Sequence, residues 1–190
     1  DSLLRTRYVR LPLIGEGHIQ TAFDGSTYQN GAAVLAMFEH WVGEERFRAG
    51  MRDYLAKRKF GSGSSDDLIA TLSAASGKGE HFAKAMRSFL DQPGVPLVQT
   101  TLSCRSGKAR LDLHQQRYLP YGVMAGESST WDVPVCVRFG RGKTMDSQCF
   151  LLAKAEASFD VEGSCPDWYL PNAAARGYYR FEMDKPDLAR

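Results

Sequence analysis

The chain has 190 residues, which allows one domain of ordinary size or two small ones. Its hydrophobic fraction of 43% is enough for a core, and its charged fraction of 24% is ordinary for a soluble protein. A net charge of +2 and the lack of a basic stripe argue against nucleic acid and membrane surfaces as partners, and no apolar run approaches the roughly 20 residues that span a bilayer.

The first ninety or so residues follow a helical period, with apolar side chains every three to four positions. Gly43 and Gly77 are placed to end helices. Ser64 is placed to cap the start of one, with the acidic Asp67 three residues later. The pattern predicts a cluster of about four to five short helices joined by tight turns. Four are defined by their apolar residues: Val34, Phe38, Trp41 and Val42; Phe47, Met51, Tyr54 and Leu55; Leu68, Ile69 and Leu72; and Phe82, Met86, Phe89 and Leu90.

Residues 92–96, Gln-Pro-Gly-Val-Pro, end the helical pattern, because two prolines around a glycine cannot continue a helix. After them apolar and polar residues alternate with a period of two, and residues 118–129 form the longest weakly patterned loop. The alternation predicts a small antiparallel β-sandwich of about seven strands, so the fold class is α+β. The strands are expected near residues 98–102, 111–113, 133–137, 148–153, 157–162, 167–170 and 177–183.

All four cysteines lie in the second half of the chain, and none forms a C-x-x-C pair typical of a zinc ribbon. Cys136 and Cys149 flank a predicted hairpin turn and can face each other across two strands, which leaves Cys104 to pair with Cys165. The alternative is four buried free thiols that pack as small hydrophobes. Disulfides would indicate a periplasmic or extracellular location. A cytoplasmic location stays open.

Four separated motifs run through the chain in one order. Residues 26–32 read Ser-Thr-Tyr-Gln-Asn-Gly-Ala, and residues 43–51 read Gly-Glu-Glu-Arg-Phe-Arg-Ala-Gly-Met. Residues 92–96 are the third motif, and residues 131–134, Trp-Asp-Val-Pro, begin the fourth. Together they resemble segments of the aminopeptidase N-like zinc metallopeptidases, the gluzincin aminopeptidases. The second and fourth motifs are extended by Tyr54-Leu55, residues 65–68, residues 168–172 and residues 177–180.

The resemblance implies a fragment of a longer enzyme. Residues 1–96 would be the C-terminal helical part of a thermolysin-like catalytic domain, residues 97–184 a β-sandwich domain, and residues 185–190 the start of a further C-terminal region. The family's zinc motif, H-E-x-x-H, is absent from these 190 residues. Zinc is therefore expected in the full-length parent and not in this fragment. The implied partners are peptide substrates of the parent and the upstream, metal-bearing part of its catalytic domain.

Tyr28 lies in the first motif, where the resemblance places the family's catalytic tyrosine. A tyrosine hydroxyl donates a hydrogen bond while remaining neutral at pH 7, which suits the stabilisation of a tetrahedral oxyanion. The alternative is a tyrosine at a helix start with its hydroxyl in solvent; the surrounding motif favours the catalytic role. One departure is Asn30, where the family usually carries a lysine.

The other polar side chains favour structural roles. Glu39 and His40 are half of a metal motif without a second histidine, and we interpret them as ordinary residues of a helix surface. Glu44 and Glu45 fit the first turn of a helix, where the helix dipole favours acids. We expect the fragment to be inactive alone. The rival hypotheses are a non-catalytic interaction module or a scaffold, and an exposed helical face offers a route to dimers.

Overall fold

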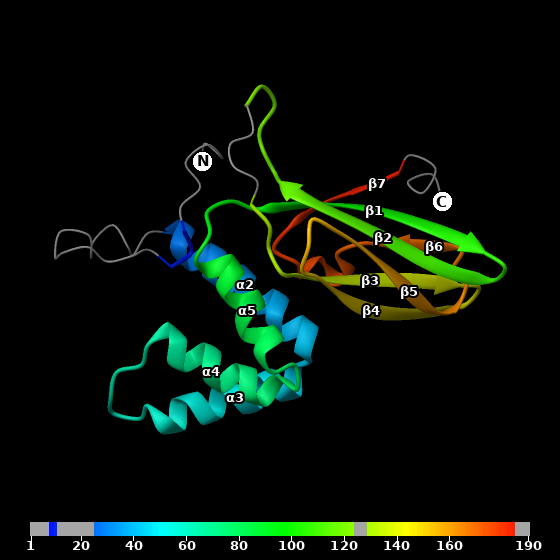
Figure 1. Ribbon diagram of the computed structural model, residues 1–190. Helices are drawn as coiled ribbons and strands as arrows, with labels where there is room; N and C mark the ends of the chain where they lie inside the picture. Colours follow the sequence, from blue (N-terminus) through cyan, green and yellow to red (C-terminus); the bar gives the residue numbers. More distant parts are fainter. Residues whose placement is uncertain (1–7, 11–24, 124–128, 185–190) are drawn as a thin grey trace.

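The computed structural model describes residues 8–10, 25–123 and 129–184. A helical unit lies beside one end of a two-sheet β-sandwich, which confirms the predicted α+β class (Figure 1). No helix in the described part of the chain is long and apolar enough to cross a membrane. The α-helices within the described residues are α2 (Gly25–Val42), α3 (Glu44–Lys57), α4 (Ser65–Ser76) and α5 (Glu80–Leu90).

The helix ends follow the local signals in the sequence. Gly43 separates α2 from α3 with a φ of 90°, a backbone angle that glycine adopts without steric cost. Ser64 and Asp67 form a capping box: the Asp67 N–H donates to Ser64 Oγ at 3.1 Å, and the Ser64 N–H donates to Asp67 Oδ2 at 2.9 Å. Gly77 ends α4 in the left-handed conformation. The predicted ends of these helices are confirmed.

Seven strands form two sheets, one with the strand order β5-β2-β1-β7 and one with the order β4-β3-β6. All neighbouring strands are antiparallel except β1 and β7, which are parallel. The chain enters β7 from the opposite sheet through a short 3-10 turn, η3 (Ala173–Ala175). The strands are β1 (Pro96–Arg105), β2 (Lys108–Arg117), β3 (Val133–Arg141), β4 (Thr144–Leu152), β5 (Glu156–Ser164), β6 (Trp168–Leu170) and β7 (Arg180–Met183).

The strands differ in length from their predicted ranges, and β4 and β7 show two physical reasons for the difference. β4 begins at Thr144, four residues before the predicted start, because its polar, exposed first residues pair with β3 up to Arg141. β7 begins only at Arg180. The residues before it are held in a loop, in which the Asn172 side chain accepts the Gly177 N–H at 2.6 Å and donates to the Gly177 carbonyl at 3.2 Å. Alternation predicts the strand but not these ends.

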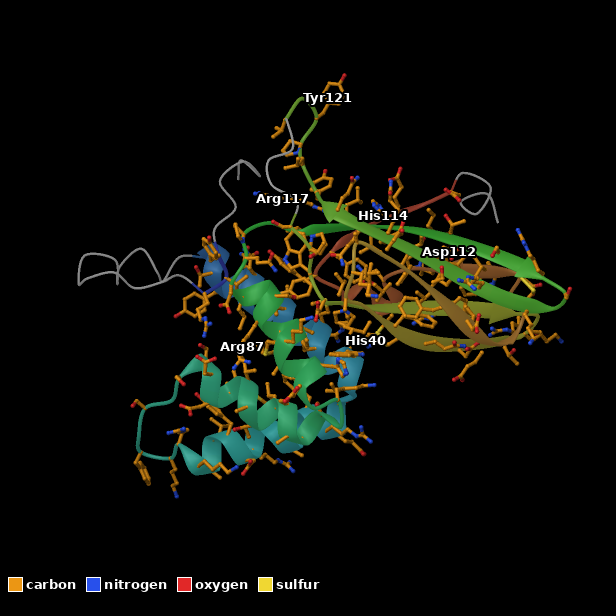
Figure 2. The ribbon with its side chains drawn as sticks, viewed as in Figure 1. His40, Arg87, Asp112, His114, Arg117 and Tyr121 are labelled. Carbon is orange, nitrogen blue, oxygen red and sulfur yellow. A yellow bond between two sulfur atoms is a disulfide. The ribbon has the colours of Figure 1, made fainter. Side chains whose placement is uncertain are left out.

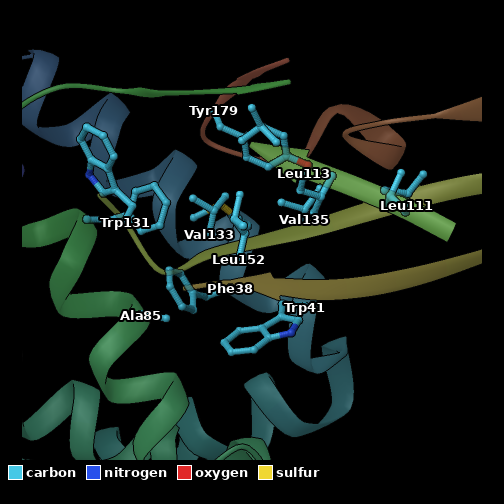
Figure 3. Close-up of a cluster of buried hydrophobic side chains, with 14 of the residues drawn as sticks. Phe38, Trp41, Ala85, Leu111, Leu113, Trp131, Val133, Val135, Leu152 and Tyr179 are labelled. Atoms are coloured by element: carbon cyan, nitrogen blue, oxygen red, sulfur yellow. The ribbon is translucent and has the colours of Figure 1, made fainter. Parts of the chain in front are cut away.

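The helical unit and the sandwich share one hydrophobic core. Phe38 of α2 is fully buried and meets Phe82 and Phe89 of α5 edge-on, with ring centroids 5.2 and 6.1 Å apart. Figure 3 shows Phe38 on the side of the helices that faces Val133 and Leu152 of the sandwich. Because the core crosses from helices to sheets, α2 is held from both sides.

Polar contacts also cross between the helices and the sandwich. The backbone N–H of Asp132 donates to Ser88 Oγ at 3.0 Å, and the Gln92 side chain donates to the Thr130 carbonyl at 3.1 Å. These bonds join the end of α5 to the segment that enters β3. The sandwich therefore has a defined orientation relative to α2 and α5.

The sandwich is closed internally by a buried glutamine. Gln115 of β2 is 2% exposed, and its side-chain nitrogen donates to the carbonyls of Trp131, Leu152 and Lys154 at 2.7, 3.2 and 2.8 Å. Its side-chain oxygen accepts the Trp131 N–H at 2.9 Å. One side chain thus satisfies backbone groups that arrive from the opposite sheet.

Two disulfides are present, and they join the pairs considered from the sequence. Cys136 and Cys149 face each other across β3 and β4, with Cα atoms 4.0 Å apart. Cys104, near the end of β1, is joined to Cys165, just before β6, with Cα atoms 5.9 Å apart. The alternative of four free thiols is wrong.

Candidate functional site

Tyr28 lies in the first turn of α2 and is 64% exposed. The buried side of α2 is formed by Val34, Phe38 and Trp41. At 3.6 residues per turn, Tyr28 projects about 80° around the helix axis from Phe38, away from the shared core. The hydroxyl is therefore carried by a helix anchored in the core, while the side chain itself stands on the surface of the helical unit.

Asn30 projects from a different side of α2 than Tyr28 does. Side chains two residues apart on a helix project about 200° apart around the axis, so they face nearly opposite directions. Asn30 is also half-buried, unlike the exposed Tyr28. The departure from the family's lysine thus concerns the other side of α2 from Tyr28.

The segment of residues 8–10 braces the start of the helical unit. Val9 approaches the backbone of α2 at Gly31, and the Arg10 N–H donates to the Leu90 carbonyl at 3.0 Å. The Arg10 guanidinium reaches Asp91 at 2.7 Å and Asp66 at 3.1 Å. A hydrogen bond from Arg87, together with the charge of Arg10, holds the pKa of the Asp66 carboxyl below its ordinary value.

These surface ion pairs position the ends of α4 and α5. Exposed pairs of this kind contribute little stability individually. No member of the cluster touches both a base and a nucleophile, so its arrangement has no catalytic chemistry of its own. Its role is to hold residues 8–10 against the helical unit.

His40 has a less exposed environment than its sequence position indicates. Its side chain is half-buried, and its Nε2 atom is buried without a hydrogen-bond partner among the described residues, so His40 is less accessible than the ordinary surface residue that we predicted. Figure 2 shows it where the helices meet the sandwich. A signal was available: His40 follows the buried Met37 by three residues and precedes the buried Trp41, so it borders the buried side of α2. Nothing in the sequence indicated that the sandwich lies next to His40.

The described histidines do not form a metal centre. His40 is on α2, His81 on α5 and His114 on β2, while His18 lies outside the described residues. Within residues 8–10, 25–123 and 129–184, no group of three or more His, Cys, Asp or Glu side chains is arranged to hold a metal ion. The donor set in this part of the chain does not fit zinc.

A wide hollow of about 650 Å³ lies over the outer face of the four-stranded sheet. Its lining is polar: a hydrogen bond of 3.0 Å joins His114 Nδ1 to Gln99, and Gln99 donates to Glu182 at 3.0 Å (Figure 2 labels His114). Tyr28 does not line this hollow. This hollow on the sandwich is thus separate from the tyrosine that the sequence singles out.

Comparison with known proteins identifies the same family as the motifs. Residues 1–92 match the model described as "Peptidase family M1 domain". The chain is 26% identical over its whole length to puromycin-sensitive aminopeptidase of Caenorhabditis elegans, covering 21% of that protein. It is 30% identical to alanine/arginine aminopeptidase of Saccharomyces cerevisiae, over 85% of this chain and 18% of the relative.

A third relative is the human thyrotropin-releasing hormone-degrading ectoenzyme, which is 26% identical over 97% of this chain and 18% of its own length. The chain therefore spans about a fifth of the length of these relatives. The matches extend beyond residue 92 into the sandwich, in agreement with a core that joins the two parts. The domain match and the similarity over the whole chain support its assignment as a fragment of the M1 peptidase family of aminopeptidase N-like enzymes.

Proposed function

We propose that this chain is part of a zinc-dependent aminopeptidase that removes N-terminal residues from peptides, and that Tyr28 stabilises the tetrahedral oxyanion in that enzyme. The observation that carries the proposal is the position of Tyr28. It is an exposed tyrosine at the start of a core-anchored helix, inside the segment that matches the M1 domain.

The chemistry required of Tyr28 is the donation of one hydrogen bond. Attack on a peptide carbonyl turns its oxygen into an oxyanion, and a donor aimed at that oxygen lowers the energy of the transition state. The phenol O–H is such a donor. Loss of one oxyanion donor typically lowers kcat by about 10²–10³-fold.

The chain alone should not hydrolyse peptides. Its described residues offer no donor set for a metal ion, so in this proposal zinc is held by the upstream, metal-bearing part of the parent's catalytic domain. We propose the following domain boundaries for the chain. Residues 1–96 complete the catalytic domain, residues 97–184 form the sandwich domain, and residues 185–190 begin a further region.

The alternative function is a non-catalytic interaction or scaffold module. The sandwich supports it, because the buried Gln115 and two disulfides hold its strands together. On the helical unit, Leu55 is 61% and Phe60 98% exposed, and these side chains offer an apolar surface for a dimer contact. The two disulfides support an oxidising compartment, periplasmic or extracellular, for either function.

A complementation assay tests the proposal. The 190-residue chain and the upstream segment of the parent are purified separately, mixed with zinc, and assayed on an aminoacyl reporter. We expect cleavage only when both pieces are present. A stable complex without cleavage would favour the scaffold function. Zinc-dependent cleavage by the 190-residue chain alone that survives Tyr28→Phe would contradict both the proposed division of the site and the role of Tyr28.

A further inference from the structure

The last turn of α2 meets the sandwich at a small hollow. The hollow has a volume of about 370 Å³ and lies between the two parts of the molecule. His40 lines it from α2, Glu44 lines it from the start of α3, and Arg176 lines it from the segment after η3. The hollow is therefore a junction between the connection from α2 to α3 and a segment of the sandwich that is more than 130 residues away in sequence.

Contacts of Tyr178 with α2 and α5 also hold this junction together. The Tyr178 N–H donates to Met37 Sδ at 3.3 Å, and the Tyr178 ring lies edge-on to Phe89 of α5 with centroids 6.3 Å apart. His40 is three residues from Met37, and Arg176 is two residues from Tyr178. A change of charge at His40 thus acts where residues 176–178 pack on α2.

The charged groups around His40 act on its protonation in opposite directions. Arg176 and Arg138, the latter on β3, both act on it as positive charges. Glu39 and Glu44 line the same hollow and favour the protonated form. Burial and the two arginines prevail over these carboxylates: desolvation, followed by Arg176 and Arg138, lowers the pKa of His40 below its ordinary value.

We propose that His40 makes the contact between the helical unit and the sandwich acid-sensitive. Protonation would place a third positive charge beside Arg138 and Arg176, on a ring whose Nε2 is buried without an acceptor. The neutral ring needs no acceptor at Nε2 when the proton is on Nδ1. The charged ring has an N–H at both positions and must leave the junction or open it to water.

The direction of the pH effect follows from the lowered pKa. In the unfolded chain His40 titrates near 6.5. In the folded chain it binds its proton only at lower pH, so the unfolded state binds more protons in between. The contribution of the neutral ring to stability is complete above about pH 6.5 and is lost as the pH falls from there towards the folded-state pKa.

The first test is the melting temperature of the 190-residue chain between pH 7.5 and pH 5. We expect His40→Gln to reduce the acid-induced fall in Tm by about 2–4 °C, the shift that corresponds to about 1 kcal/mol of stability in a chain of this size. His114→Gln is the matched control, because His114 lies on the outer sheet face and is hydrogen-bonded to Gln99. An equal fall in the wild type and in His40→Gln would overturn the proposal.

Two spectroscopic readouts separate a junction from a general loss of stability. In an NMR titration, the His40 ring should titrate below 6.5, and Arg176→Gln should raise its midpoint. At pH 5.5, hydrogen exchange in residues 36–44 should be faster in the wild type than in His40→Gln, with equal exchange in β1 and β2. A midpoint at or above 6.5, or equal exchange at the junction in both proteins, would contradict the proposal.

Discussion

The helical unit and the sandwich of this chain bury their side chains in different ways. The sandwich closes on itself, with a buried glutamine, two disulfides and sheet faces that pack on each other. In the helical unit, α3 contributes one fully buried residue, Gly50, while Leu55 and Phe60 stand exposed. The helices therefore depend on α2 and α5 and on their contact with the sandwich. The unit that carries Tyr28 is the less self-sufficient one.

The largest effect on stability is expected from Phe38, which lies in the core that the two units share. Phe38→Ala should destabilise the chain by about 3–5 kcal/mol, because it removes a fully buried ring and leaves a cavity in the shared core. Phe60→Ala is the control: Phe60 is 98% exposed, and its loss should be nearly neutral. Urea unfolding followed by far-UV circular dichroism measures both. A destabilisation by Phe38→Ala below about 1 kcal/mol would show that the core is not shared.

The two disulfides should differ in their effect on the sandwich. Cys104–Cys165 closes a loop of 61 residues and Cys136–Cys149 one of 13 residues. In the chain-entropy model these loops correspond to about 4 and about 3 kcal/mol. We expect Cys104→Ser/Cys165→Ser to lower the urea midpoint more than Cys136→Ser/Cys149→Ser. The reverse order would indicate that strain or residual structure, and not loop length, determines the contribution of each bridge.

Gln115 should be the polar residue on which the sandwich depends most. Gln115→Ala leaves the backbone groups of Trp131, Leu152 and Lys154 without their buried partner, at a cost of about 2–3 kcal/mol. Gln99→Ala removes a half-buried glutamine on the outer face of the same sheet and should cost less than about 1 kcal/mol. Thermal unfolding of the two variants makes the comparison. Equal losses would mean that water satisfies the groups around Gln115.

The smallest effect concerns the helical unit alone. Ser64→Ala removes the cap of α4 and should cost about 1 kcal/mol, with faster hydrogen exchange confined to the first turn of α4. Ser62→Ala, in the exposed turn before it, is the control and should change neither quantity. Loss of protection throughout the sandwich in Ser64→Ala would contradict the separation between a self-contained sandwich and a dependent helical unit.

Local signals account for what the sequence predicted of the fold. Gly43, Ser64 and Gly77 each determine a helix end through their own backbone or side chain, so no tertiary information is needed. The parallel pairing of β1 with β7 was not predictable in this way. A period of two identifies a strand and its buried face but does not identify its neighbour.

The candidate site shows the same difference between local signals and tertiary contacts. The motif around Tyr28 is continuous in sequence, and the resemblance alone suggested its role. The environment of His40 is made by Arg138 and Arg176, about a hundred residues or more away in the chain, so a helical pattern places His40 near the core without revealing the charges that face it. Sequence periodicity reports the element on which a side chain lies, and only the fold reports what surrounds it.

The role of Tyr28 is tested most directly by the turnover rate of the enzyme reassembled from this chain and the zinc-bearing upstream segment. Tyr28→Phe removes only the hydroxyl, and it should lower kcat by about 10²–10³-fold with little change in KM. Tyr54→Phe removes the hydroxyl of a tyrosine on α3 that lies against Gly63, and it should leave kcat unchanged. A kcat of Tyr28→Phe within about twofold of the wild type would contradict the assignment of Tyr28 as the oxyanion donor.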